Sequence, residues 1–267
     1  MKAECLLGQY ACIRVGTGPE PLIVLPWIND SLERSADREK LIAWVCREYA
    51  RDRSVLWISR KRNMPAGYSI PEMAADYASI LAKEYGRADV IGLSLGSVIA
   101  QELAATYPHL VRRIVLAMAG ARLARSTLGI YRHWIQLAQQ RRWQELYLDL
   151  IARTYAGATR AVFESILSRQ DKSLSEEPPS PSDFVVSVNA CLRHDSRPQL
   201  LRIEAPALVV GGTEDQLMPV ELFREMAEMI PNSRLHLFEG AGHGVFAERK
   251  DEFDHLICGF LGYGNRD

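Results

Sequence analysis

The 267-residue sequence lacks a large excess of charge of either sign. It contains 32 Lys and Arg residues against 33 Asp and Glu residues, which gives a formal net charge of −1. Domains that bind nucleic acids usually present a strongly basic face. This balance therefore argues against a nucleic-acid partner, and the pairs Arg112-Arg113 and Arg141-Arg142 are interpreted as solvated ends of helices or strands.

Cysteine is scarce and unpatterned. The five cysteines, which form an odd, scattered set without a C-x-x-C spacing, are Cys5, Cys12, Cys46, Cys191 and Cys258. Four of the five sit among apolar residues, as small core side chains do. This usage agrees with a reduced compartment, so we expect a cytoplasmic protein.

Long apolar runs are also missing. No run approaches eighteen residues, so no membrane span and no membrane partner are expected. The first 16 residues carry Glu4 and Gln9 where a signal peptide would need an unbroken apolar stretch.

What the chain does contain is an alternation of short apolar runs and helical patterns. Two short antiparallel strands are predicted at its start, followed by buried strands and helices in turn. The predicted strands cover residues 3–8, 10–15, 22–25, 53–59, 90–93, 114–118, 207–210 and 234–238. The predicted helices cover residues 35–50, 70–85, 220–230 and 247–261. This order predicts an α/β fold, with a mostly parallel sheet covered by helices on both faces.

Residues 123–198 interrupt that alternation. They show helical spacing and loops but no strand in the earlier rhythm, and the stretch SLSEEPPSPSD at 173–183 is predicted to be irregular. We therefore predict a core of residues 1–122 and 199–267, with a helical cap formed by residues 123–198 inserted over the sheet.

Three motifs follow predicted strands. Gly92-Leu93-Ser94-Leu95-Gly96 joins a strand directly to a helix, and its glycines allow the close approach that lets a serine hydroxyl project from a tight turn. Gly212-Thr213-Glu214-Asp215 places carboxylates after a strand, and Gly240-Ala241-Gly242-His243 places an imidazole after the last strand. Parallel strands bring all three motifs to one edge of the sheet.

These motifs, in this order, resemble the α/β-hydrolase superfamily over essentially the whole chain. The resemblance implies Ser94 as the nucleophile, His243 as the general base and then acid, and Asp215 as the carboxylate that orients the imidazole. A serine is inert until a base takes its proton, so the chemistry agrees. Glu214 competes with Asp215 for the acid role, and the G-x-x-D spacing with Pro219 favours Asp215.

The chain departs from the family in the loop that supplies an oxyanion donor. Many members have His-Gly there, whereas this chain has Leu25-Pro26-Trp27-Ile28-Asn29-Asp30. Proline has no N–H, so the donor must be Trp27 or Ile28, and Ile28 is the better match to the motif. The resemblance implies the Leu95 N–H as the second donor. Trp27 is either a packing residue or a substrate-binding wall of the acyl pocket.

Two further groups of residues are candidate substrate contacts. One arginine of Ser59-Arg60-Lys61-Arg62 could approach a substrate carboxylate, but a solvated surface is the favoured interpretation. The aromatic residues of the insertion fall at helical spacing, so most are interpreted as cap core and only one or two are expected to touch substrate: Tyr131, Trp134, Trp143, Tyr147, Tyr155 and Phe163.

The resemblance implies a serine hydrolase that cleaves an ester, thioester or lactone of a small to medium, largely apolar molecule through an acyl-enzyme, without metal or organic cofactor. Serine at position 94 disfavours the aspartate-nucleophile relatives. Three alternatives stay open: a carbon–carbon bond hydrolase or lyase, an acyltransferase or cyclase, and a non-catalytic binding protein on the same fold. A monomer or a homodimer is expected.

Overall fold

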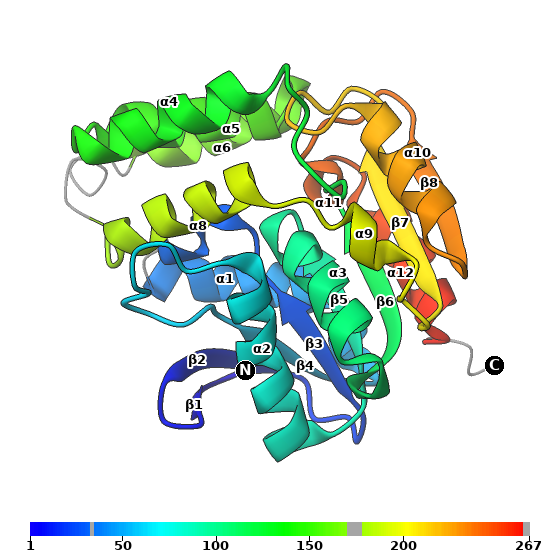
Figure 1. Cartoon of the computed structure of the whole chain (residues 1–267). Coiled ribbons are helices and arrows are strands. Elements are labelled where there is room, and N and C mark those ends of the chain that lie inside the picture. The colour runs from blue at the N-terminus through cyan, green and yellow to red at the C-terminus, as the bar shows by residue number, and fades with distance from the viewer. Residues whose placement is uncertain (33–34, 170–177, 264–267) are drawn as a thin grey trace.

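The computed structural model describes residues 1–32, 35–169 and 178–263. Within them a single sheet runs in the order β1-β2-β4-β3-β5-β6-β7-β8 (Figure 1). Its strands are β1 (Lys2–Leu6), β2 (Tyr10–Val15), β3 (Pro21–Leu25), β4 (Ser54–Ile58), β5 (Ala88–Leu93), β6 (Val111–Ala117), β7 (Ala207–Gly212) and β8 (Ser233–Phe238). Strand β2 pairs antiparallel with β1 and β4, and the remaining pairs are parallel. The predicted α/β fold is confirmed.

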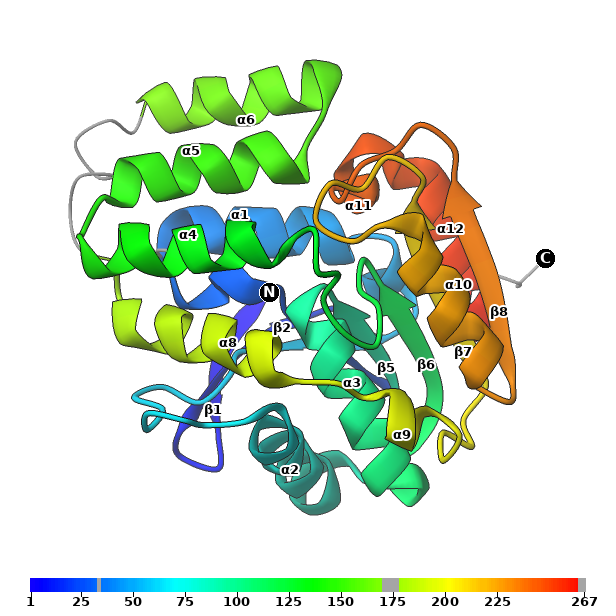
Figure 2. The ribbon, with the colours of Figure 1, turned by 45° about the horizontal axis from the view of Figure 1, so that its top comes forward.

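Helices cover both faces because the buried strands alternate their apolar side chains. In β3, Ile23 and Leu25 belong to one core cluster while Leu22 and Val24 belong to the other, as a period of two requires. The first cluster includes side chains of α2 (Ile70–Ile80), α3 (Leu95–Thr106) and α10 (Val220–Met229). The second includes side chains of α1 (Ser35–Cys46) and α12 (Lys250–Leu261). The sheet therefore lies between two apolar cores. Figure 2 shows from a tilted view that helices cover both faces of the sheet.

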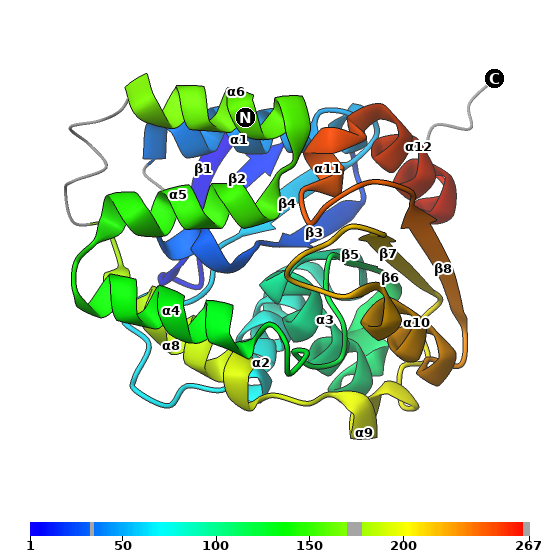
Figure 3. The same ribbon diagram turned by 90° about the horizontal axis from the view of Figure 1, so that it is seen from above.

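Four helices of the predicted cap lie over one edge of the sheet: α4 (Leu128–Gln139), α5 (Trp143–Thr154), α6 (Gly157–Arg169) and α8 (Pro181–Arg193). Helix α4 packs between α5 and α8, and α6 packs on α5. Figures 1 and 3 show this layer above the carboxyl ends of the parallel strands, with the strands visible beneath it from above. We call these four the cap helices; the division of the chain at residues 123 and 198 stays a prediction.

The remaining described elements are short and connect the larger ones. They are η1 (Ile28–Ser31), η2 (Tyr49–Arg51), the π turn η3 (Leu81–Tyr85), η4 (Pro108–Leu110), α9 (Arg197–Leu200) and α11 (Val245–Glu248). None of the described helices has the length and apolar character needed to cross a membrane.

Two predicted boundaries were wrong. The stretch 173–183 was expected to be irregular, but α8 begins at Pro181, because a proline in the first helical turn loses no intrahelical hydrogen bond. Residues 173–177 lie outside the described residues. The single helix expected over residues 247–261 is two helices, α11 and α12, separated at Arg249, whose φ of −129° and ψ of 43° are not helical.

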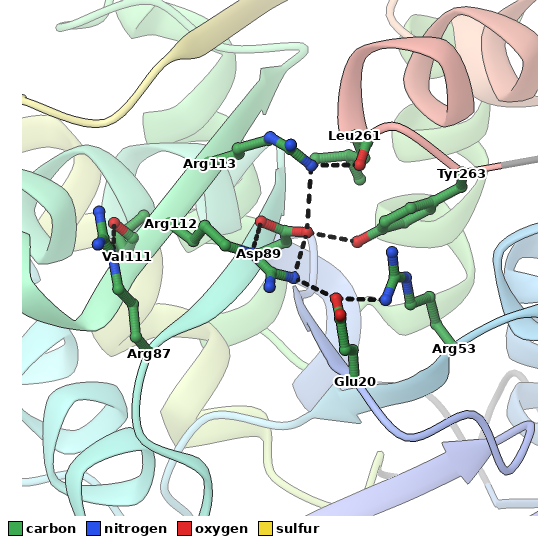
Figure 4. A network of polar contacts seen from close by, with 9 residues as sticks. All are labelled: Glu20, Arg53, Arg87, Asp89, Val111, Arg112, Arg113, Leu261 and Tyr263. Atoms are coloured by element: carbon green, nitrogen blue, oxygen red, sulfur yellow. Dashed lines mark hydrogen bonds and ion pairs between the residues drawn. The ribbon is translucent and has the colours of Figure 1, made fainter. Parts of the chain in front are cut away.

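A polar network lies at the amino ends of β5 and β6, which is the end of the sheet opposite the cap helices (Figure 1). Figure 4 shows its residues from close by. Asp89 is fully buried there and accepts from Arg112 Nε over 2.9 Å and from the Tyr263 hydroxyl over 2.7 Å. Arg112 also bonds Glu20 over 2.8 Å. Arg112 lies at the start of a strand, as expected, but its side chain is only 34% exposed and its guanidinium neutralises a buried carboxylate. The Tyr263 hydroxyl on the same carboxylate ties the residues after α12 to the sheet.

Candidate active site

Ser94 stands at a strained turn between β5 and α3. Its φ is 54° and its ψ is −115°, a conformation that non-glycine residues adopt at a cost and that occurs mainly at functional sites. The flanking glycines are required by crowding, since a Cβ on Gly96 would lie 2.0 Å from the Leu25 carbonyl oxygen and one on Gly92 would lie 2.5 Å from the Ser97 Cα. The turn is tight because β5 ends at Leu93 and α3 begins at Leu95, which leaves Ser94 as the single residue between them.

The structure brings Ser94, Asp215 and His243 together at the carboxyl edge of the sheet. The His243 Nε2 lies 3.0 Å from the Ser94 Oγ, and its Nδ1 lies 2.7 Å from the Asp215 Oδ2. The other oxygen of Asp215 accepts the main-chain N–H groups of Leu217 and Met218 over 2.8 and 2.9 Å. These bonds fix the carboxylate in a buried position, with one oxygen left for the imidazole.

Glu214 occupies a different environment. Glu214 is exposed to solvent, whereas Asp215 is buried and bonded to His243. The Glu214 main-chain N–H donates to the Ala241 carbonyl over 2.9 Å, which joins the two loops without its side chain. Of the two candidate carboxylates, Asp215 is the one in position to orient the imidazole.

This arrangement selects one tautomer of the His243 imidazole. An ionised carboxylate can only accept hydrogen bonds, so the nitrogen facing Asp215 carries the proton. The opposite nitrogen then has a free lone pair aimed at the Ser94 hydroxyl, which can donate its proton to it. The three side chains can therefore generate a serine nucleophile.

The candidate oxyanion donors lie at two helix starts. Ile28 begins η1 and Leu95 begins α3, and the first N–H groups of a helix have no partner within that helix. Ile28, Trp27 and Leu95 all line the cavity that contains Ser94. Trp27 precedes η1 in an extended conformation and also packs, with its ring stacked on Phe246 at a centroid distance of 5.1 Å. Both interpretations of Trp27, packing and pocket wall, are thus compatible with its position.

The solvated interpretation of Arg60 was wrong. Its side chain is buried and donates to the carbonyl oxygens of Pro26, Trp27 and Ile28. Arg62 donates to the Asp30 carbonyl over 3.4 Å. Neither arginine is among the described residues that line the cavity. No sequence motif marked Arg60; its position just beyond a central strand was the one available signal.

A cavity of about 250 Å³ opens above Ser94 between the core and the cap helices. Among the described residues that line it, none is Asp, Glu, Lys or Arg, and most are aliphatic or aromatic. Five of the six aromatic candidates of the insertion contribute to the lining, namely Tyr131, Trp134, Tyr147, Tyr155 and Phe163, whereas Trp143 does not. The cavity thus offers a mostly apolar surface next to the serine.

Two other potential nucleophiles of the cavity, Cys191 and Tyr131, are buried in a way that favours their neutral forms. Burial raises the pKa of the Cys191 thiol to about 12 and raises the pKa of the Tyr131 hydroxyl well above its usual value. Among the described residues that line the cavity, Ser94 is the one whose hydroxyl bonds an imidazole. No cluster of three or more potential metal ligands occurs among the described residues.

Similarity to known proteins agrees with the observed fold. Residues 57–250 match the family model described as alpha/beta hydrolase fold. The chain belongs to this family. It is 30% identical to a poly(3-hydroxyalkanoate) depolymerase of Ectopseudomonas oleovorans over 198 residues, which cover 73% of this chain and 68% of that protein.

A second relative of this alpha/beta hydrolase is the 2-hydroxy-6-oxononadienedioate/2-hydroxy-6-oxononatrienedioate hydrolase of a Pseudomonas species. The two are 26% identical over 188 residues, which span 66% of this chain but only 63% of the relative's length. The enol-lactonase of Burkholderia xenovorans LB400 has the same fold, with a TM-score of 0.82 at 22% identity, covering 98% of this chain and all of that one. The two relatives named above act as a depolymerase and a hydrolase, and the chain is an enzyme of the alpha/beta hydrolase family.

Proposed function

We propose that the chain is a serine hydrolase that cleaves an ester, thioester or lactone through an acyl-enzyme. The observation that carries the proposal is the pair of contacts at His243, 3.0 Å to the Ser94 Oγ and 2.7 Å to Asp215. A serine, base and carboxylate in this order and geometry form the constellation that activates a hydroxyl for acyl transfer.

The reaction follows from these positions. As Ser94 attacks the substrate carbonyl, His243 takes its proton and Asp215 stabilises the imidazolium. The tetrahedral intermediate carries a negative oxygen, which the N–H of Leu95 and that of Ile28 or Trp27 would stabilise. The imidazolium then protonates the leaving oxygen or sulfur as the bond to it breaks, which leaves an acyl group on Ser94. Water, deprotonated by the neutral imidazole, releases the acid and restores the serine. No step requires a metal or an organic cofactor.

The lining of the cavity supports a neutral, largely apolar acyl group of small to medium size. Burying an ionised group without a partner costs several kcal/mol, and no described lining residue carries an opposite charge. A volume of about 250 Å³ suits a small molecule and excludes a folded protein. The relative named as a poly(3-hydroxyalkanoate) depolymerase agrees with ester cleavage.

The relative named for a dioate substrate raises a second candidate, hydrolysis of a different bond in a doubly charged molecule. Because the described lining residues include no cation, the structure favours the neutral ester or thioester. Transfer of the acyl group to an acceptor other than water, including ring closure, uses the same acyl-enzyme and is separated from hydrolysis only by its products. We further propose a cytoplasmic enzyme that acts as a monomer or homodimer on a small-molecule substrate.

A panel of p-nitrophenyl esters, acyl thioesters and lactones tests this function. We expect hydrolysis of neutral short- and medium-chain substrates, with release of the free acid detected by mass spectrometry. Turnover confined to cleavage of a carbon–carbon bond, or acyl products formed only when a second alcohol or amine is supplied, would instead support one of the alternatives. Absence of turnover on all classes, with no adduct at Ser94, would support a binding protein.

A further inference from the structure

Arg60 places a buried positive charge directly behind the loop that carries the candidate oxyanion donors. The residue is 3% exposed. Its Nη1 donates to the Pro26 and Trp27 carbonyl oxygens over 3.1 and 3.0 Å, and its Nη2 donates to the Ile28 carbonyl oxygen over 3.0 Å. A guanidinium stays protonated in proteins, so these are charge-assisted bonds to three consecutive carbonyl groups.

The sheet explains why Arg60 reaches this loop. Strands β3 and β4 are parallel neighbours, with Val24 paired to Trp57, so their carboxyl ends lie side by side. Arg60 comes two residues after β4, and Pro26 comes directly after β3. The side chain therefore crosses from one strand end to the next without entering the cavity.

The bonds to the carbonyl groups also set the direction of the N–H groups. No cis peptide bond occurs in the described chain, and in a planar trans peptide the C=O and N–H point in opposite directions. The Trp27 carbonyl and the Ile28 N–H share one peptide unit, so a carbonyl held toward Arg60 turns that N–H away from Arg60. The Pro26 carbonyl and the Trp27 N–H are related in the same way.

An N–H group that points away from Arg60 points toward the side of the loop that faces the Ser94 cavity. Trp27 and Ile28 line the cavity that contains Ser94, whereas Arg60 does not. A positive charge at the carbonyl end of a peptide also polarises it, which makes the N–H at the other end a better donor, and the low dielectric of a buried position strengthens this effect.

We propose that Arg60 is a positioning residue that holds the Ile28 N–H, or the Trp27 N–H, toward the oxyanion formed at Ser94. This inference rests on the proposed function. Arg60 does not touch the substrate; it acts by fixing the peptide units that do. Since Pro26 cannot donate, the loop has few N–H groups for this role, and their orientation depends on the carbonyl clamp.

The test uses two substitutions, Arg60→Met and Arg60→Lys, in the full-length enzyme. For Arg60→Met we expect kcat to fall about 100-fold, the scale on which a misplacement of about 1 Å or a lost oxyanion donor acts, while KM changes little. The affinity for a neutral trifluoromethyl ketone that forms a hemiketal on Ser94 should fall in parallel with kcat. Arg60→Lys keeps the charge without the planar fork, so it should lie between the parent and Arg60→Met.

Arg112→Met is the matched control, because it removes a guanidinium from the polar network at the amino ends of β5 and β6, far from the carboxyl ends where Ser94 lies. Its melting temperature should fall, since the buried Asp89 loses a charged partner, but its kcat should stay near that of the parent. If Arg60→Met does not fold, Arg60→Lys carries the comparison.

Parent-like kcat and ketone affinity in folded Arg60 variants would overturn the inference, as would a loss of stability alone, like that of Arg112→Met. A parent that hydrolyses acyl substrates while the Arg60 variants do not lose turnover leaves the proposed function standing and removes Arg60 from it. A parent without acyl turnover overturns the proposed function and this inference together.

Discussion

The Gly244 N–H donates to the Thr154 carbonyl over 2.6 Å, which bonds the residue next to His243 directly to the end of cap helix α5. Glu248 reinforces this junction, since its carboxylate accepts the Gly242 N–H over 2.7 Å and the Ala156 N–H over 2.8 Å. The loop that carries the proposed general base is therefore fastened to the cap on both sides of the histidine. The position of the cap and the position of the imidazole are coupled.

Glu248→Ala should lower kcat because it frees both loops from a shared anchor. We expect a loss of about 10-fold, less than the ~100-fold that a 1 Å misplacement can cost, since the Gly244 bond to Thr154 remains. Steady-state kinetics on a neutral ester measure this effect. Glu252→Ala is the control, because Glu252 is an exposed carboxylate paired with Arg249. Equal kcat values in the two variants would contradict the coupling.

The two adjacent acidic residues should respond differently to substitution by their amides. Asp215→Asn replaces the carboxylate bonded to His243, which should reduce kcat roughly 10⁴-fold because the tautomer and the imidazolium lose their support. Glu214→Gln alters an exposed side chain and should leave kcat near the parent value. Kinetics with thermal unfolding as a folding check separate the outcomes, and the reverse pattern would assign the acid role to Glu214.

Much of the fold was predictable because its signals are local. Apolar runs such as Leu22–Leu25 mark buried strands, and the glycines around Ser94 report a turn that only small neighbours permit. Each of the three motifs directly follows a predicted parallel strand, which predicted that the motifs meet at the carboxyl ends of the strands. Arg60 could not be understood in this way, because its contact depends on β4 lying beside β3, and strand neighbours are not written in any local pattern. The same holds for the partner of Arg112, which comes from β5.

Acyl chains that end in a carboxylate should be poor substrates. Compared with a methyl-terminated ester of the same length, such a chain should lose at least about 100-fold in kcat/KM, because a buried charge without a partner costs several kcal/mol. Matched p-nitrophenyl esters of a fatty acid and of a dicarboxylic half-acid provide the measurement. Comparable kcat/KM values for the two would mean that a cation reaches the bound substrate.

His194 should make the folded state less stable at mildly acidic pH. Burial lowers its pKa from 6.5, although Asp195 acts in the opposite direction. The unfolded chain therefore binds the proton first as pH falls, so the contribution to the free energy of unfolding is complete above pH 6.5 and decreases below it until the folded state is also protonated. His194→Gln should flatten this dependence between about pH 7.5 and pH 5.5 in chemical unfolding. His109→Gln, at an exposed position, is the control, and an equal pH slope in both variants would contradict the assignment.

The central claim is that Ser94 becomes acylated, and the most direct measurement is peptide mass spectrometry after reaction with a fluorophosphonate. The account predicts one phosphonyl group on the peptide that contains Ser94, with no adduct on folded Ser94→Ala and a loss of turnover of about 10⁶-fold in that variant. Labelling of the parent at another residue, or hydrolysis by Ser94→Ala at a rate near that of the parent, would contradict it.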